Sequence, residues 1–134
     1  MPFLLDTTVC SQSLRSRRGA RVSSRLIQYS GQLYVSRLSC AQLYALGYRA
    51  DAKRLGEIDD LLNELDIVEF DESCAREYGR IHARLAERGR NSGRTDLMIA
   101  ATALVHGLVL VTHDRDFTRV AEVIPELRLA DWLA

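Results

Sequence analysis

The 134-residue sequence lacks a long apolar run, and no stretch approaches the roughly 20 apolar residues that a membrane-spanning helix requires. Its first six residues also lack the basic segment that opens a secretory signal peptide. We therefore expect no membrane partner. The 47% hydrophobic content is too high for a disordered chain, and the length favours one domain over residues 1–134.

Cysteine is scarce and shows no metal-binding spacing. Cys10, Cys40 and Cys74 are odd in number, far apart and set among apolar residues. The sequence has neither a Cys-x-x-Cys motif nor a histidine pair of the kind that binds zinc. We expect reduced, buried thiols in a cytoplasmic protein instead of a disulfide framework.

Lysine is almost absent, because Lys53 is the single lysine among 18 basic residues. The net charge is zero, yet residues 1–50 carry seven arginines and one acid. The planar guanidinium of arginine suits phosphate groups, although a GC-rich genome produces the same bias. Five arginines soon after the first strand are candidate RNA contacts, and equally a solvated helix face: Arg15, Arg17, Arg18, Arg21 and Arg25.

Short apolar segments alternate with amphipathic ones along the chain. The apolar segments predict strands at 3–5, 33–36, 67–70, 108–111 and 127–129. Between them, apolar residues recur at helical spacing, and we expect Ser39 to cap the helix after the second strand. This alternation predicts βαβ units, and hence an α/β fold with a parallel sheet covered by helices on both faces.

Carboxylates follow two of these strands. Asp6 comes after the first strand, Asp114 and Asp116 come after the fourth, and Asp96 begins the helix before the fourth. Each could simply be a helix cap, but ligands in such sheets bind at the carboxyl ends of the strands. Two charges 4 Å apart repel by roughly 4 kcal/mol, so several carboxylates at one edge require a cation. Oxygen ligands without Cys or His favour Mg²⁺ or Mn²⁺.

Four segments contain these acids and their neighbours, namely 4–9, 39–44, 95–101 and 112–117. In this order, and over the whole chain, they resemble the four motifs of PIN-domain ribonucleases. They are similar in particular to the VapC toxins of bacterial and archaeal toxin–antitoxin pairs. The ordered set of four motifs carries the resemblance, because no single motif is specific.

The resemblance implies a three-layer sandwich with a parallel sheet of about five strands in the order 3-2-1-4-5. It also implies Mg²⁺- or Mn²⁺-dependent cleavage of single-stranded or looped RNA, and two protein partners: an antitoxin and a second copy in a homodimer. The matching positions are metal ligands at Asp6, Asp96 and Asp114, a further acid at Asp116, and supporting hydroxyls at Thr7 and Thr112.

The family usually has glutamate where this chain has Gln42. Glutamine cannot be a general base and is a weaker ligand for a hard cation. Three explanations of Gln42 stay open. It is an engineered inactivating substitution, or it belongs to a natural toxin that binds RNA or antitoxin without cutting. In the third, the chain still cuts RNA with its remaining acids, Asp6, Asp96, Asp114 and Asp116. Because the missing charge at residue 42 would weaken the binding of a second metal ion most, we predict at most one firmly held metal ion.

Two functions from other classes compete with a metal-dependent endoribonuclease. A catalytically silent PIN module would bind RNA or an antitoxin. Phosphate chemistry in another doubly wound protein fits poorly, because a phosphatase favours Asp-x-Asp after the first strand, whereas this chain has Asp6-Thr7-Thr8. A receiver domain needs a lysine after a late strand, and the single lysine is Lys53.

Overall fold

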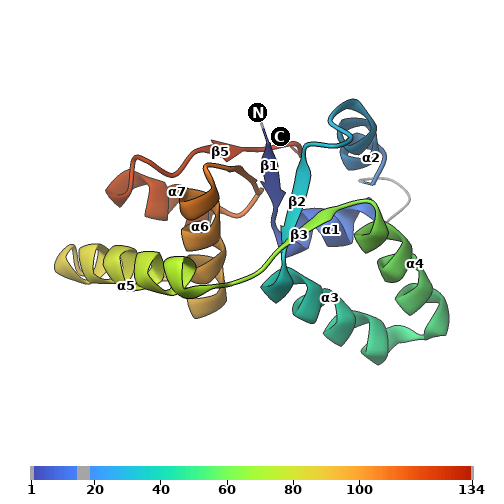
Figure 1. Ribbon diagram of the computed structural model, residues 1–134, viewed down its shortest axis with the longest axis horizontal. Helices are drawn as coiled ribbons and strands as arrows, with labels where there is room; N and C mark the ends of the chain where they lie inside the picture. The colour runs from blue at the N-terminus through green and yellow to red at the C-terminus, as the bar shows by residue number, and fades with distance from the viewer. Residues whose placement is uncertain (1, 15–18, 134) are drawn as a thin grey trace.

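The computed structural model describes residues 2–14 and 19–133. At its centre lies a five-stranded parallel sheet with the order β3-β2-β1-β4-β5 (Figure 1), which confirms the expected topology. The strands are β1 (Phe3–Leu5), β2 (Leu33–Ser36), β3 (Asp66–Val68), β4 (Val109–Val111) and β5 (Leu129–Ala130).

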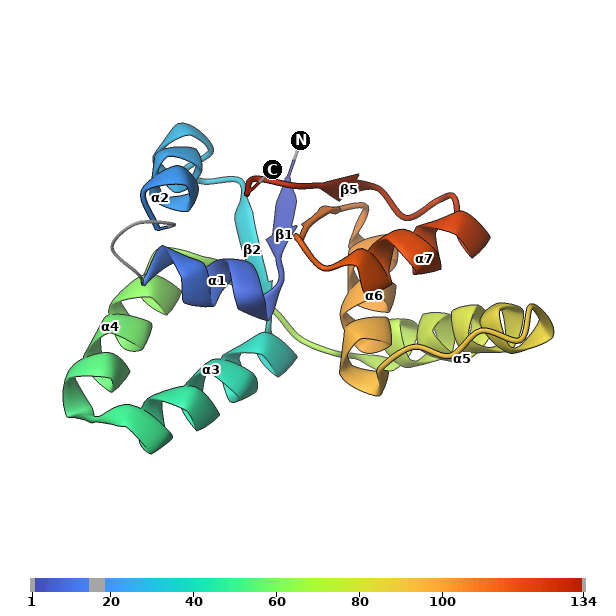
Figure 2. The same cartoon turned by 180° about the vertical axis from the view of Figure 1, so that it is seen from behind.

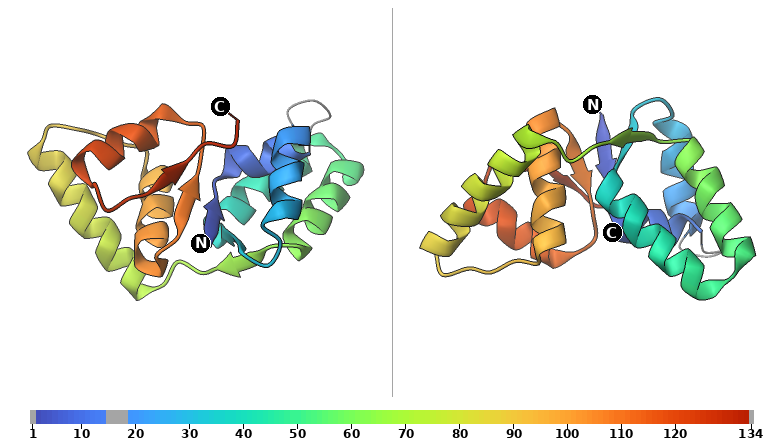
Figure 3. Two further views of the ribbon diagram at one scale, coloured as in Figure 1. Left: turned by 90° about the horizontal axis from the view of Figure 1, so that it is seen from above. Right: turned by 60° about the horizontal axis from the view of Figure 1, so that its bottom comes forward.

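Helices cover the sheet on both sides. One group consists of α1 (Thr7–Ser13), α2 (Gly19–Gln28), α3 (Arg37–Ala50) and α4 (Ala52–Asn63), and the other of α5 (Glu72–Glu87), α6 (Arg94–His106) and α7 (Arg115–Val123). Figure 2 shows the two groups from behind, and Figure 3 from two further directions. The α/β sandwich expected from the alternating pattern is therefore confirmed.

The side chains of the two central strands alternate between two cores. Leu4 and Leu110 pack with residues of α5, α6 and α7, whereas Leu5 and Val111 pack with residues of α1 to α4. Successive residues of a strand face opposite sides of the sheet, so wholly apolar strands are required here. All four of these side chains are fully buried.

The central position of β1 determines where its last residue leads. Leu5 is in register with Val35 of β2 on one side and with Val111 of β4 on the other. The next amide extends this pairing, since Asp6 N donates to Val111 O at 3.1 Å. Asp6 therefore lies at the carboxyl edge of the sheet, beside the end of β4.

Several predicted boundaries were wrong. Ser36, not Ser39, caps α3, because Ser36 has extended backbone angles and its hydroxyl accepts from Leu38 N. The third strand ends at Val68 instead of residue 70, where the chain turns so that Asp71 can cap α5. The helix that contains Asp96 begins two residues earlier, at Arg94.

The fourth and fifth strands also differ from the predicted ranges. The fourth begins at Val109 rather than at residue 108. The fifth is Leu129–Ala130 rather than 127–129, because Leu127 N donates to Ile124 O in the preceding turn. Leu127 is buried in the core beside α7 instead of extending the strand.

The three cysteines are free and buried, as the sequence predicts. Burial raises the pKa of the Cys10 thiol far above its ordinary value. In the part of the chain that the structure describes, no helix has both the length and the apolarity needed to cross a bilayer.

Candidate active site

Asp6 is a buried carboxylate, with 4% of its surface exposed, and both of its oxygens accept hydrogen bonds. Oδ1 accepts from Val9 N at 2.8 Å, and so caps α1. Oδ2 accepts from the Thr112 hydroxyl at 2.5 Å. Thr112 Oγ1 also accepts from Asp114 N at 3.0 Å. One threonine therefore connects the acid after β1 to the acid after β4.

Asp96, Asp114 and Asp116 form a tighter group, in which one carboxylate oxygen from each lies within 4.8 Å of the others. Asp114 caps α7, and its Oδ1 accepts from Asp116 N at 2.9 Å. Asp96 lies in the first turn of α6, whose start is brought to this edge by the loop after α5. Asp6, Asp96 and Asp114 also line one cavity of about 360 Å³.

The acids destabilise one another as anions. Burial raises the pKa of Asp6 above its ordinary value. The hydrogen bond from Thr112 lowers the pKa in part, whereas the charge of Asp114 raises it further. Burial also raises the pKa of Asp96, with added repulsion from Asp114, Asp6 and Asp116. These carboxylate oxygens are the ligands that a hard divalent cation prefers, so the residues present fit such an ion.

Gln42 reaches the same cavity from α3. Its Oε1 accepts a hydrogen bond from the Thr7 hydroxyl, and the Ser39 hydroxyl lies 3.0 Å from the same Thr7 oxygen. Because each hydroxyl has one proton, Thr7 donates to Gln42 while Ser39 donates to Thr7. Thr7 thus supports Gln42, whereas Thr112 supports Asp6.

Arg49 lines this cavity as well, although it is not among the site residues predicted from the sequence. It lies seven residues after Gln42 on α3, with Leu46 between them on the same wall. Spacings of four and seven place residues on one helix face, so this signal was available in the sequence. A cation on the wall of an acidic cavity gives the site a place for a phosphate group.

Of the five arginines predicted to contact RNA, the structure describes two, and neither lines this cavity. Arg15, Arg17 and Arg18 lie outside the described residues. Arg21 and Arg25 lie on α2, which precedes β2 at the opposite end of the sheet from Asp6 (Figure 1). Arg21 there donates to the Leu133 carbonyl at 3.4 Å.

Comparisons with known proteins agree with this geometry. Residues 3–123 match the PIN domain family. The chain is 31% identical over 136 residues to ribonuclease VapC2 of Haemophilus influenzae, with 99% of each covered. It is also 31% identical over 137 residues to the tRNA(fMet)-specific endonuclease VapC of Shigella flexneri, with 98% of each covered. A solved structure of DNA-bound VapBC from Salmonella typhimurium has a chain that is 27% identical, with a TM-score of 0.86 and 98% of both chains covered.

Proposed function

The chain belongs to the PIN-domain family, and from this membership we propose that it is the toxin of a toxin–antitoxin pair and acts as a metal-dependent endoribonuclease. The observation that carries the proposal is the cluster of four acids at the carboxyl edge of the sheet, which are Asp6, Asp96, Asp114 and Asp116. The full-length relatives named as ribonuclease and endonuclease support the same reaction.

Asp96, Asp114 and Asp116 would hold the cation, with Asp6 beside them in the cavity. A bound Mg²⁺ or Mn²⁺ supplies positive charge that polarises the phosphate and lowers the pKa of a water molecule. Thr112 holds the Asp6 carboxylate in one orientation, so the carboxylate is positioned before substrate binds. Arg49 on the cavity wall attracts the phosphate backbone of the RNA.

Gln42 sets the level of activity in this proposal. It is neutral and accepts a hydrogen bond from Thr7, so it cannot remove a proton from water. Proton removal then depends on the remaining acids, and cleavage is slow. A general base contributes typically 10²–10⁴-fold to a rate, so we expect Gln42→Glu to raise cleavage by about 100-fold. The competing function is a PIN module that binds RNA or an antitoxin without cutting.

One experiment separates these functions. The protein, its Gln42→Glu form and its Gln42→Glu/Asp96→Asn form are incubated with RNA and Mg²⁺, and again with EDTA. Cleavage that is faster in the Gln42→Glu form, requires Mg²⁺ and disappears with Asp96→Asn supports the ribonuclease. Cleavage by the Gln42→Glu form alone identifies a disabled toxin. Cleavage by none of the three would instead favour the silent binding module.

The proposed partners are RNA, a second copy of the chain and an antitoxin whose segment fills the acidic cavity. The similarity to a chain of a solved VapBC structure supports the antitoxin. The proposal further takes residues 1–134 as one domain of a cytoplasmic protein, in keeping with its three free, buried cysteines. Light scattering of the purified chain, alone and co-expressed with the product of a neighbouring gene, tests the homodimer and the complex.

A further inference from the structure

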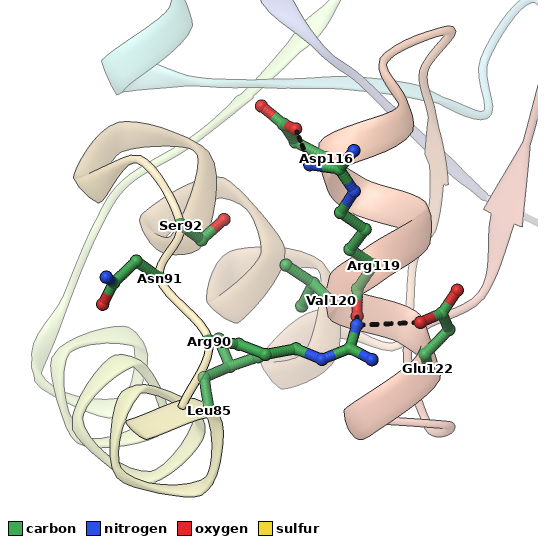
Figure 4. Close-up of a pocket in the computed structure, with 8 residues that line it drawn as sticks. All are labelled: Leu85, Arg90, Asn91, Ser92, Asp116, Arg119, Val120 and Glu122. Atoms are coloured by element: carbon green, nitrogen blue, oxygen red, sulfur yellow. Dashed lines mark hydrogen bonds and ion pairs between the residues drawn. The ribbon is translucent and has the colours of Figure 1, made fainter. Parts of the chain in front are cut away.

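A second cavity, of about 460 Å³, adjoins the acid cluster and is not used by the proposed reaction. It lies between α7 and the loop that joins α5 to α6 (Figure 4). Asp116 belongs both to its wall and to the acid cluster. The cavity and the acid cluster therefore share one carboxylate, which places the cavity next to any molecule bound at the acids. We call it the Arg90–Arg119 cavity, after its two cationic side chains.

The lining of this cavity suits a nucleotide. Arg90 and Arg119 offer guanidinium groups that match phosphate oxygens, and Asn91 and Ser92 offer an amide and a hydroxyl. The carboxylates of Glu122 and Asp116 complete the polar lining, and each pairs with one of the two arginines. Figure 4 shows Ser92 on the loop and Arg119 on α7, on opposite sides of the space. The volume lies within the range of about 300–1,000 Å³ that is common for small-molecule sites.

The loop side of the cavity is held in place by the end of α5. Gly89 has a positive φ of 64° and donates to Ala86 O, while Arg90 N donates back to Leu85 O at 2.9 Å. This reversal is a common way to end a helix. The Arg90 guanidinium then binds Glu122 of α7 at 2.8 Å. The cavity is therefore bounded by two fixed elements.

Arg119 can exchange its protein partner for a phosphate at low cost. It lies 3.5 Å from Asp116, and the two side chains are 71% and 54% exposed. Exposed ion pairs of this kind contribute only about 0–1 kcal/mol. Because Asp116 belongs to the acid cluster, a cation bound there would also compete with Arg119 for its carboxylate. Either event leaves the guanidinium available to RNA.

Resting on the proposed ribonuclease activity, we propose that the Arg90–Arg119 cavity binds the sugar and phosphate of the nucleotide next to the scissile phosphate. Arg119 and Arg90 contact the backbone phosphate, and Ser92 hydrogen-bonds the nucleotide. Binding of this kind follows the backbone and is insensitive to base sequence. The cavity therefore positions the strand, and its arginines act on affinity more than on the chemical step.

The first test measures RNA affinity without cleavage. A fluorescent single-stranded RNA of about 12 nucleotides is titrated in EDTA at several salt concentrations. We expect Arg119→Ala to weaken binding about five- to tenfold and to reduce the salt slope by about one. Arg76→Ala is the matched control, because Arg76 is 80% exposed and also pairs with one carboxylate, Glu72 at 3.3 Å. Equal affinities for the Arg119 and Arg76 variants would overturn the inference.

The second test locates the RNA by thiol protection. Since the three native cysteines are buried, Ser92→Cys introduces an accessible thiol in the cavity. We expect the same RNA to slow its reaction with a maleimide at least threefold. Ser24→Cys on α2, beside Arg21 and Arg25, is the control and should react at an unchanged rate. Protection at residue 24 instead of residue 92 would place the RNA on α2 and reject the cavity.

The outcomes separate the inference from the proposed function. RNA cleavage together with an unprotected Cys at 92 overturns the inference and leaves the ribonuclease intact. If RNA protects the thiol of Ser92→Cys but the Gln42→Glu form does not cut RNA, the cavity is supported and the ribonuclease activity is overturned. Absence of both RNA binding and cleavage rejects both. A protein segment that fills the cavity instead would leave RNA affinity unchanged in Arg119→Ala.

Discussion

At the scale of single residues, Asp6 shows how one side chain serves both the fold and the site. It caps α1 through Oδ1 and accepts from Thr112 through Oδ2, while it faces the acidic cavity. One aspartate can therefore cap a helix and belong to the functional site at the same time. The same holds for Asp114, which caps α7 and belongs to the acid cluster.

Asp96→Asn should trade stability against activity. Burial and the charges of three neighbouring acids raise the pKa of Asp96, so removing its charge relieves both the cost of burial and the repulsion in the metal-free protein. We expect the melting temperature in EDTA to rise by roughly 2–4 °C. Cleavage should fall at least 100-fold, because a cation ligand is lost. Asp60→Asn, at an exposed position on α4, is the control for a general effect of charge, and a lower melting temperature for Asp96→Asn would contradict the repulsion.

Thr112→Val should loosen the site while keeping its shape. The change removes the donor to buried Asp6 Oδ2 and the acceptor for Asp114 N. Leaving such groups unpaired costs about 1–3 kcal/mol, and cleavage should fall about tenfold as both acids lose their orientation. Thr112→Ser keeps the hydroxyl and should retain most of the activity. Chemical denaturation and initial cleavage rates measure the two effects, and equal behaviour of the two variants would refute the role of the hydroxyl.

At the scale of elements, α3 carries Gln42 and Arg49 to the cavity, and its position depends on close contact with α4. A Cβ added at Gly47 would lie 2.8 Å from Leu55 Cδ2 and 2.9 Å from Ile58 Cδ1. These distances are shorter than ordinary carbon contacts of roughly 3.5–4.0 Å. The glycine therefore allows α3 and α4 to pack at their observed separation.

Gly47→Ala should destabilise the protein by about 1–3 kcal/mol, because overpacking outweighs the gain in helix propensity. Gly56→Ala on α4 is the matched control, since nothing lies within 4 Å of its added Cβ. That change should stabilise the protein by about 0.5–1 kcal/mol, as expected for alanine in place of glycine in an open helix. Urea denaturation of both variants measures the difference, and a stabilising Gly47→Ala would show that α4 shifts freely.

The elements also differ in how closely their sequence predicts them. Strands β1, β2 and β4 were located well, because wholly apolar runs between polar residues leave few alternatives. The cap of α3 was wrong, because Ser36 and Ser39 are chemically equivalent candidates and only backbone geometry separates them. The Arg90–Arg119 cavity was missed, since its two arginines are 29 residues apart and meet only through the packing of α7 against the loop.

At the scale of the whole molecule, the acidic cluster couples stability to pH and to metal. Asp6 and Asp96 have pKa values raised above the ordinary 3.8, so the folded chain binds more protons than the unfolded chain just above that pH. Their contribution to the free energy of unfolding therefore falls as pH rises from about 4 through the raised pKa values, and is constant above them. A bound cation offsets this loss where the acids are ionised.

The stabilisation by Mg²⁺ should consequently depend on pH. At a concentration tenfold above the dissociation constant, a ligand adds about 1.4 kcal/mol, and we expect a matching rise in melting temperature at pH 7 to 8. The rise should shrink towards pH 4, because Asp6 and Asp96, whose pKa values are raised, take up protons as the pH falls. Asp96→Asn should show little rise at any pH. Thermal melts in Mg²⁺ and in EDTA provide the measurement, and a rise of the same size at pH 4 and pH 7 would place the ion elsewhere.

The hydrogen bond between Thr112 and Asp6 joins residues that are 106 positions apart. The central strand β1 is the first to leave the ribosome, but its neighbour β4 and three of the four acids arrive only after most of the chain has been made. At translation rates of roughly 5–20 residues per second, that interval is about 5–20 seconds. A nascent chain therefore has no assembled active site next to the ribosome that makes it, and we expect a chain halted at His106 to release no RNA fragments.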